Sequence, residues 1–335
     1  MNCLVTGGGG FLGLAVVKQL CSRGHTVRTF QRGKYAELDA LGVESIQGDI
    51  TDAAAIAAAA KGVDTVFHVA AKPGVWGTYA DFHSPNVIGT QNVLSACRSN
   101  SIPRLIFTSS PSVVFGGNNE NGITESAPYA RRYLAHYPKT KAIAEQLVLA
   151  ANSVELATIA LRPHLIWGPN DPHLVPRILE RARIGRLSMI GNRKNLVDST
   201  YIDNAANAHL LAADRLAPGS PISGKAYFIS NGEPLPMADL IRRILSAAGI
   251  EPVIPTLNSH LAYAAGTAME LTHKLLRLKH EPLLTRFVAR QLSTAHWFDI
   301  SAAKRDLGYE PQVTIEEGMQ RLAKSLRETP LEIRR

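Results

Sequence analysis

Short apolar runs alternate with longer amphipathic stretches through the first half of the chain. The apolar runs predict buried β-strands, and the stretches between them have the spacing of helices. The predicted strands cover residues 2–6, 25–30, 44–47, 64–69, 104–109 and 156–161. The predicted helices cover residues 11–23, 53–61, 85–99 and 137–151. This regular alternation predicts an α/β fold, in which helices cover both faces of a doubly wound parallel sheet.

The alternation becomes irregular after about residue 163, where Pro and Gly are more frequent. Residues 236–295 have a mainly helical pattern. We therefore expect a sheet domain at 1–163 and a smaller, mostly helical cap at 164–335. Segments near 195–230 are expected to return to the first domain.

The composition is that of a soluble globular protein, with 45% hydrophobic and 19% charged residues. Three cysteines without paired spacing argue against disulfides and against a metal site, so we expect a reducing, cytoplasmic environment. The first residues enter a predicted strand at once, which leaves no room for a signal peptide. No apolar run reaches the ~20 residues of a spanning helix.

The net charge of +8 raises the question of nucleic-acid binding. Basic residues form only short clusters, such as Arg131–Arg132 and residues 181–186, and no nucleic-acid-binding motif is present. We therefore expect no nucleic-acid partner. A basic surface also suits phosphorylated cofactors, acyl carboxylates and lipid headgroups.

The first predicted strand runs directly into a glycine-rich turn, TGGGGFLG. Gly7, Gly10 and Gly13 have the spacing that a dinucleotide-binding turn requires, since the backbone must approach a pyrophosphate and the helix must pack close to the sheet. Phe11 and Leu12 open the helix and offer free N–H groups to the phosphates. The sequence therefore predicts a Rossmann domain.

The end of the second strand predicts which cofactor binds. An NAD site would place Asp or Glu there for the ribose hydroxyls, and this chain has Gln31 followed by Arg32. Arg28 and Lys34 lie nearby. Because a guanidinium pairs well with a 2′-phosphate, we predict NADPH/NADP+ with Arg32 as the main contact. The alternative is surface arginines without a role.

Two further strand ends are expected to bind the cofactor. Asp49 would bond the adenine amino group while Ile50 packs on the ring, although Asp49 could equally serve a turn or helix cap. After the fourth strand, Ala70 and Ala71 would let the cofactor lie close to the backbone. His68 is interpreted as a structural residue.

The segments FTSSPS and HYPKTKA supply the candidate chemistry. Ser110 follows the fifth strand, where parallel sheets bind ligands. Tyr137 and Lys141 are four residues apart, which places them on one face of a helix about 6 Å apart along its axis. A nearby ammonium favours the phenolate, so the pair could transfer protons. The alternative is an ordinary surface pair.

With these motifs the chain resembles the extended short-chain dehydrogenases/reductases. The resemblance extends through "NVIGTQNVL", "LRPHLIWGP", "STYIDNAANAH" and "FDISAAKRDLGYEP" and covers nearly the whole chain. It implies that Tyr137 is the acid/base, Lys141 its partner and Ser110 the third member, with Ser109 adjacent. It places Pro163 and His164 beside the nicotinamide, in the same group of contacts. A homodimer is expected on the same ground.

Within that family the chain looks like the 3β-hydroxysteroid dehydrogenase branch. The segments "AAKPGVWGTY", "YFISNGEPLP" and "EPLLTRFVARQLSTAHWF" most resemble a bacterial group that reduces 2-alkyl-3-oxoalkanoic acids in long-chain olefin biosynthesis. This implies a long-chain β-keto acid substrate and assembly with other enzymes of that pathway. The alternatives are a steroid or sterol-carboxylate dehydrogenase, a nucleotide-sugar epimerase or dehydratase, and a non-enzymatic NADPH-sensing module.

A substrate with two long chains needs apolar walls and a cation for its carboxylate. Three aromatic residues of one loop could line such a pocket or simply pack the loop: Trp76, Tyr79 and Phe82. The candidate cations are Lys72, His164 and Arg193.

Residues 260–287 mix apolar positions with Lys274, Arg277 and Lys279. This pattern could form a basic amphipathic surface that contacts a membrane or a partner enzyme. The alternative is a cap helix that covers the substrate site.

Overall fold

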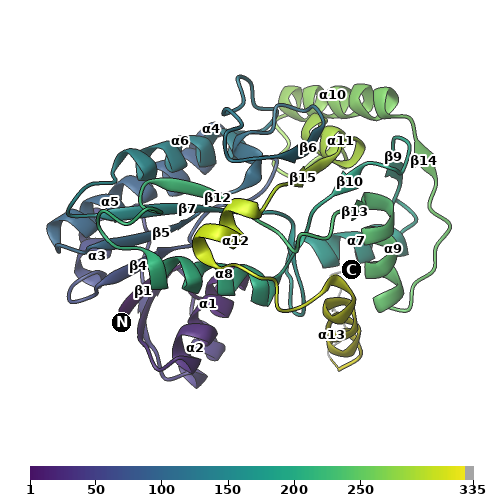
Figure 1. The fold of residues 1–335 in the computed structure, drawn as a ribbon. Helices are drawn as coiled ribbons and strands as arrows, with labels where there is room; N and C mark the ends of the chain where they lie inside the picture. Colours follow the sequence, from purple (N-terminus) through teal and green to yellow (C-terminus); the bar gives the residue numbers. More distant parts are fainter. Residues whose placement is uncertain (329–335) are drawn as a thin grey trace.

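The computed structural model describes residues 1–328 and contains a seven-stranded parallel sheet (Figure 1). The strand order is β12-β7-β5-β4-β1-β2-β3. The strands are β1 (Asn2–Thr6), β2 (Thr26–Gln31), β3 (Glu44–Gln47), β4 (Thr65–His68), β5 (Arg104–Thr108), β7 (Ala157–Pro163) and β12 (Lys225–Ile229). The order reverses between β1 and β4, and such a switch point creates a binding crevice at the carboxyl ends of the strands.

Helices cover both faces of this sheet. Alternate residues of a strand point to opposite faces, so Cys3 and Val5 belong to one apolar cluster and Leu4 to another. Helices α1 and α8 pack on the first side, and α3, α5 and α6 on the second (Figure 1). The helices of this part are α1 (Phe11–Ser22), α2 (Ala36–Ala40), α3 (Ala53–Ala59), α4 (Tyr79–His83), α5 (Gly89–Ser99), α6 (His136–Ala150), α8 (Ile202–Arg215) and α12 (Ser301–Leu307).

The predicted Rossmann fold is confirmed, and all six predicted strands are present within a few residues of their expected bounds. The pattern did not predict β12 as a seventh strand; it pairs in parallel with β7. The helix expected at 85–99 also begins differently, because a π-helical turn at Ser84–Ile88 precedes α5. Pro85 lies in that turn, and a proline lacks the N–H that a regular helix would use.

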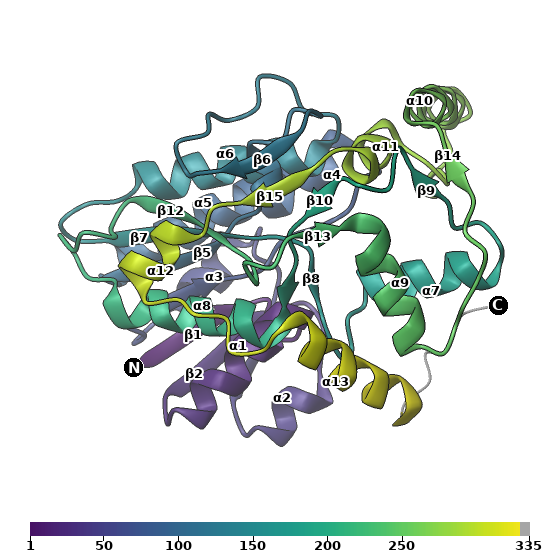
Figure 2. The same ribbon diagram turned by 45° about the vertical axis from the view of Figure 1, so that its right-hand side comes forward.

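The cap contains a second, four-stranded sheet in the order β13-β10-β15-β6 (Figure 2). Its strands and the shorter ladders beside it are β6 (Glu120–Ile123), β8 (Ile166–Trp167), β9 (Met189–Ile190), β10 (Leu196–Val197), β11 (Thr200–Tyr201), β13 (Leu235–Pro236), β14 (Thr256–Leu257) and β15 (His296–Phe298). The cap helices are α7 (Leu174–Arg183), α9 (Met237–Ala247), α10 (Ser259–Leu275), α11 (Arg286–Ser293) and α13 (Ile315–Glu328). β6 comes from the first half of the chain, so the two parts exchange strands: β6 joins the cap sheet and β12 the main sheet.

The cap and the sheet domain share one apolar core. Trp167 and Tyr201 are buried in the cluster that also contains Val16 and Leu20 of α1. Helix α13 closes this junction through Gly318, where an added Cβ would lie 2.7 Å from the Tyr201 ring and 2.8 Å from the Trp167 ring. The shared core holds the cap against the carboxyl ends of the main strands.

Candidate active site

The glycine turn after β1 requires its glycines for close packing. Gly7 has a φ of +71°, and a Cβ there would lie 2.9 Å from the backbone of Ala70. A Cβ on Gly13 would lie 2.0 Å from the carbonyl oxygen of Gly7. The turn, the start of α1 and the loop after β4 therefore meet without side chains between them, as close backbone approach to a pyrophosphate requires.

Helix α1 begins with an open N-terminus. Gly10 is the N-cap residue and provides no side-chain cap, so the N–H groups of the first turn, which includes Phe11 and Leu12, remain available to an anion. The ring of Tyr35 lies against the turn, 2.1 Å from where a Cβ of Gly9 would be. Tyr35 was not predicted, and nothing in its local sequence indicates this contact.

The structure separates the basic residues at the end of β2. Arg28 is bound on the protein surface, because its guanidinium donates to Glu44 at 2.7 Å and to the carbonyl of Ala59 at 2.9 Å. Arg32 is exposed, and no hydrogen bond or ion pair engages its side chain within residues 1–328. The buried Gln31 side chain donates to Ser45 at 2.7 Å, and its own oxygen has no partner there. Arg32 is thus the guanidinium that a 2′-phosphate could still recruit.

Asp49 and Ile50 adopt local roles after β3. One carboxylate oxygen of Asp49 accepts bonds from the backbone and the hydroxyl of Thr51, which lower its pKa. Asp52, not Asp49, caps α3. Ile50 is buried, and a Cβ on Gly89 would come within 2.3 Å of its side chain. The predicted turn role of Asp49 therefore accounts for one carboxylate oxygen, and the other has no hydrogen-bond partner within residues 1–328.

The end of β4 is held by a buried polar network. His68 bonds Thr6 at 2.8 Å and Thr90 at 2.9 Å, and burial, assisted by Lys141, lowers its pKa to about 3. A neutral imidazole with a hydrogen bond at each ring nitrogen matches the structural role expected for His68. Ala70 packs on the glycine turn, whereas Ala71 is exposed.

The structure brings Ser110 and Tyr137 together. Burial raises the pKa of Tyr137 to about 12, and the adjacent Ser110 side chain counteracts part of that shift. The Ser110 hydroxyl also accepts from the backbone N–H of Ser112 at 3.2 Å, which fixes it at the start of a 3₁₀ turn. Ser109 is buried, and its hydroxyl has no partner within residues 1–328. Ser110 is therefore the serine that faces the phenol.

Lys141 lies one turn along α6 from Tyr137 and is buried. Its ammonium donates to the carbonyl of Thr108 at 2.5 Å and lies 4.0 Å from the centroid of the Phe107 ring. Burial lowers the pKa of Lys141 to about 7, and the charge of Glu145 opposes this shift. The side chains of Tyr137 and Lys141 thus both lie at the carboxyl end of β5, because residues four positions apart share one face of a helix.

A buried ion pair supports this end of α6. Arg162 donates to the two carboxylate oxygens of Glu145 at 3.0 Å and 2.6 Å, and the hydroxyl of Tyr129 donates to the same carboxylate at 2.7 Å. The sequence interpretation missed all three residues. Their positions in the sequence could have indicated two of them, because Glu145 follows Lys141 by one helical turn and Arg162 directly precedes Pro163.

His164 belongs to a pair of buried histidines. Its Nε2 bonds Nδ1 of His296 at 2.7 Å, and Nε2 of His296 lies 2.6 Å from the carbonyl of Gln291. Since the carbonyl only accepts, His296 donates to Gln291 and accepts from His164. Burial lowers the pKa of both imidazoles. A neutral His164 follows Pro163 directly, but it provides no cation for a carboxylate.

Lys72 is positioned by Asn86 after β4. The Asn86 side chain accepts from the backbone N–H of Lys72 at 2.7 Å and donates to its carbonyl at 3.1 Å. The Lys72 ammonium lies 5.2 Å from the ring centroid of Phe82, which is buried. Phe82 therefore packs α4 against the loop, and no ion pair engages the Lys72 ammonium within residues 1–328.

Of the other two aromatic residues, Trp76 lies in the loop and contacts the cap, whereas Tyr79 is the first residue of α4 and faces the start of α6. The indole N–H of Trp76 donates to the carbonyl of Leu278 at 3.4 Å. Tyr79 lies edge-on to His136, with ring centroids 5.7 Å apart, and under the ammonium of Lys139. The loop thus connects α6 with the segment after α10.

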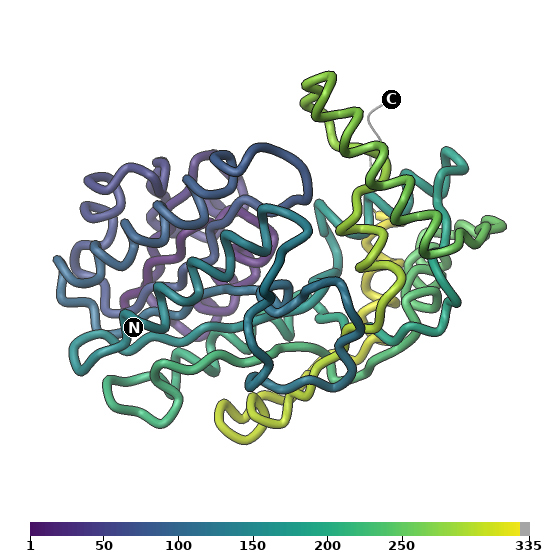
Figure 3. Tube along the Cα trace, turned by 90° about the horizontal axis from the view of Figure 1, so that it is seen from above, coloured from purple at the N-terminus to yellow at the C-terminus, as the bar shows by residue number. Residues whose placement is uncertain are grey.

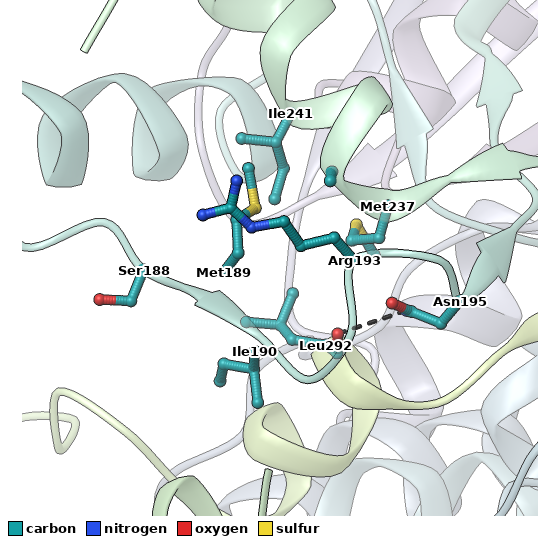
Figure 4. Close-up of a pocket in the computed structure, with 9 residues that line it drawn as sticks. Ser188, Met189, Ile190, Arg193, Asn195, Met237, Ile241 and Leu292 are labelled. Carbon is teal, nitrogen blue, oxygen red and sulfur yellow. Dashed lines mark hydrogen bonds between the residues drawn. The ribbon is translucent and has the colours of Figure 1, made fainter. Parts of the chain in front are cut away.

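Arg193 lies in a small pocket inside the cap (Figure 4). Its guanidinium donates to the Thr256 hydroxyl at 2.6 Å and to the carbonyl of Ile254 at 2.7 Å. The other residues around the pocket are Ser188, Met189, Ile190, Asn195, Met237, Ala238, Ile241 and Leu292. Arg193 braces the strand β14, so its hydrogen-bonding groups are largely used within the cap.

A parallel sheet with a glycine turn after its first strand, and a Tyr–Lys pair on the helix after its fifth, defines an extended short-chain dehydrogenase/reductase. Comparison with known families is more specific. The chain belongs to the 3-beta hydroxysteroid dehydrogenase/isomerase family, whose sequence model matches residues 4–257.

Individual relatives span the whole chain. It is 54% identical over 327 residues to the 2-alkyl-3-oxoalkanoate reductase of Stenotrophomonas maltophilia, and this alignment covers 97% of this chain and 99% of the relative. It is 38% identical to the human decarboxylating sterol-4-alpha-carboxylate 3-dehydrogenase, over 97% of this chain and 88% of the relative. The structure of MoeE5 in complex with UDP-glucuronic acid and NAD is 25% identical, with a TM-score of 0.75 over 98% of this chain and all of that one.

Proposed function

We propose that this protein is an NADPH-dependent reductase that converts a 2-alkyl-3-oxoalkanoic acid into the 3-hydroxy acid in long-chain olefin biosynthesis. The observation that carries the proposal is the partly buried Tyr137 phenol beside Ser110, with the buried Lys141 on the same helix face. The substrate class comes from the reductase of Stenotrophomonas maltophilia, which shares 54% of its aligned residues with this chain.

The residues at the sheet edge fit a dinucleotide. The close glycine packing and the open start of α1 suit a pyrophosphate, and Lys141 would hold the nicotinamide ribose. When bound, the reduced cofactor supplies the hydride that goes to C3 of the keto acid.

Tyr137 would donate the proton that the C3 oxygen requires. Because burial raises its pKa to about 12, the phenol is protonated at neutral pH, which suits the reductive direction. Ser110 would orient the carbonyl by donating its hydroxyl hydrogen. The ammonium of Lys141 would stabilise the phenolate that remains, and its position against the carbonyl of Thr108 keeps it near the strand end.

The selection of NADPH is proposed from two neighbouring residues. Gln31 takes the position at which an acid would repel a 2′-phosphate, and its side chain is turned toward Ser45. Arg32 is exposed and unengaged within the described chain, so it can pair with that phosphate. Asp49 keeps one carboxylate oxygen for the adenine.

A sterol-type dehydrogenase is the second candidate, because the family and the human relative at 38% identity both belong to that chemistry. It would use the same three residues on a rigid alcohol. The larger identity to the keto-acid reductase favours the first candidate.

The test is the oxidation of NADPH with a synthetic 2-alkyl-3-oxoalkanoic acid, measured beside a 3-ketosteroid. Tyr137→Phe should lower kcat by about 100-fold or more, since a positioned general acid contributes about that factor. The matched control is Tyr227→Phe in the edge strand β12 of the main sheet, which removes a phenol hydroxyl bonded to Asp306. Turnover of the steroid alone would refute the keto-acid assignment, and full activity of Tyr137→Phe would refute the role of the phenol.

A further inference from the structure

Helix α10 turns an apolar face to the solvent. Leu261 and Leu271 are each 63% exposed, and Leu275 is 84% exposed. Ala264 and Ala268 are exposed between them. The spacing of three and four residues places all five on one side of the helix. Figure 3 shows α10 at the outer margin of the cap, projecting beyond its neighbours.

The opposite face of α10 is firmly packed, so the exposed face is not a product of a loose helix. A Cβ on Gly266 would lie 2.8 Å from the backbone of Thr285, at the start of α11. The buried Glu270 accepts from the backbone N–H of Arg286 at 2.7 Å and from its guanidinium at 2.8 Å. These contacts fix the rotation of α10 and direct the leucines outward.

Basic residues lie at the carboxyl end of this apolar face. Lys274, Arg277 and Lys279 are exposed, and Leu276 among them is 61% exposed. The acidic residues on either side of them in the sequence are paired with other cations: Glu270 with Arg286 and Glu281 with Arg177. Within residues 1–328 no ion pair engages Lys274, Arg277 or Lys279, so the apolar face continues into a region of positive charge.

This end of α10 adjoins the residues around the candidate active site. The Trp76 indole, in the loop after β4, bonds the carbonyl of Leu278. His136, which precedes Tyr137, has its pKa lowered by burial and by the charges of Lys274 and Lys139. The apolar and basic surface thus begins where the loop after β4 and the start of α6 meet.

We propose that these residues form a docking surface for an anionic lipid bilayer, called here the α10 surface. It comprises Leu261, Ala264, Ala268, Leu271, Lys274, Leu275, Leu276, Arg277 and Lys279. The apolar helix face can contact the acyl region of such a bilayer, and the cationic end can contact its anionic headgroups. No helix within residues 1–328 is long and apolar enough to cross a membrane, so the contact is peripheral.

A bilayer is favoured over a second copy of the chain by this charge distribution. Lipid headgroups offer the anions that the α10 surface lacks, whereas the same surface of a second copy offers only more cations. The link to activity rests on the proposed function: a substrate with two long alkyl chains partitions into the bilayer and would enter beside Trp76. Vesicle binding is measured without substrate or NADPH, so it can fail independently of the reductase assignment.

The experiment is co-sedimentation of the full chain with extruded vesicles of phosphatidylglycerol and phosphatidylcholine, compared with pure phosphatidylcholine. We expect binding to the anionic vesicles at low salt and weaker binding at high salt, because the headgroup attraction is screened. Lys274→Glu/Arg277→Glu should weaken binding by about 30-fold or more, since one basic residue near such a surface contributes about a factor of five.

Leu271→Ser/Leu275→Ser should weaken binding by about tenfold or more through the lost apolar burial. The matched controls are Val154→Ser, an exposed apolar residue elsewhere, and Lys61→Glu/Lys225→Glu, which changes the net charge equally. Circular dichroism of each variant checks that the exposed substitutions leave the fold intact.

Loss of binding in both test variants and its retention in both controls would support the α10 surface. Absence of wild-type binding at low salt would overturn it, as would equal binding by test and control variants. Analytical ultracentrifugation provides the competing outcome: self-association that Leu271→Ser/Leu275→Ser abolishes, without vesicle binding, would make this face a contact between copies.

Discussion

The buried ion pair between Arg162 and Glu145 supports a quantitative prediction about the helix that carries Tyr137 and Lys141. The side chain of Glu145 is fully buried and that of Arg162 is 4% exposed. Arg162→Met keeps an unbranched apolar chain beside the rings of Phe228 and Tyr129 but leaves the carboxylate without its cation.

The cost follows from the burial of the remaining charge. Removing one partner of a buried pair costs about 3–5 kcal/mol, because the other charge stays desolvated. Arg162→Met/Glu145→Gln removes both charges, and replacing a whole buried pair is often near neutral. The amide oxygen introduced by Glu145→Gln would still accept from the Tyr129 hydroxyl, so we expect the double variant to recover about 2 kcal/mol or more of the loss.

Urea unfolding of the two variants and the wild type measures these free energies. The matched control is Arg242→Met, which breaks an exposed pair with Asp239 and should cost less than about 1 kcal/mol. A loss below about 1 kcal/mol in Arg162→Met, or a double variant less stable than the single one, would refute the reasoning.

Two more predictions concern the cofactor and the pH dependence of stability. Arg32→Ala should raise the KM for NADPH about tenfold or more and leave that for NADH nearly unchanged, because only the 2′-phosphate loses a charged partner; equal effects in steady-state kinetics would exclude Arg32 as the phosphate contact. Burial raises the pKa of Asp198 from 3.8 to about 6, so its stabilising contribution is complete below pH 3.8 and is lost as pH rises through 6. Asp198→Asn should therefore raise the free energy of unfolding at pH 7 by about 3 kcal/mol and make the melting temperature nearly independent of pH between about pH 4 and 6. The control is Asp39→Asn at an exposed position. If the melting temperature of Asp198→Asn depends on pH as that of the wild type does, the assignment is contradicted.

Local spacing was enough to predict most of the sheet domain. Six strands, the glycine turn and the helix that starts at His136 follow from contacts between residues close in sequence, where apolar period and turn chemistry decide the structure. The spacing of Tyr137 and Lys141 likewise predicted that both lie on one helix face. The resemblance to the extended short-chain dehydrogenases/reductases, and to the 3β-hydroxysteroid branch, is confirmed by the comparisons.

The positions that depended on distant contacts could not be predicted in this way. β12 joins the sheet only because β7 offers a free edge, and β6 leaves the first half of the chain to pair with β15. His164 is paired with His296, a residue that lies 132 positions later.

The sequence by itself therefore determined the fold class, the cofactor-binding turn and the identity of the candidate catalytic residues. The tertiary structure alone decided which groups are free to act. It bound Arg28 to Glu44 and left Arg32 available, set Ser110 rather than Ser109 beside the phenol, and exposed one face of α10. The physical reason is that burial and hydrogen-bond partners, which set charge and reactivity, arise from packing between segments far apart in the chain.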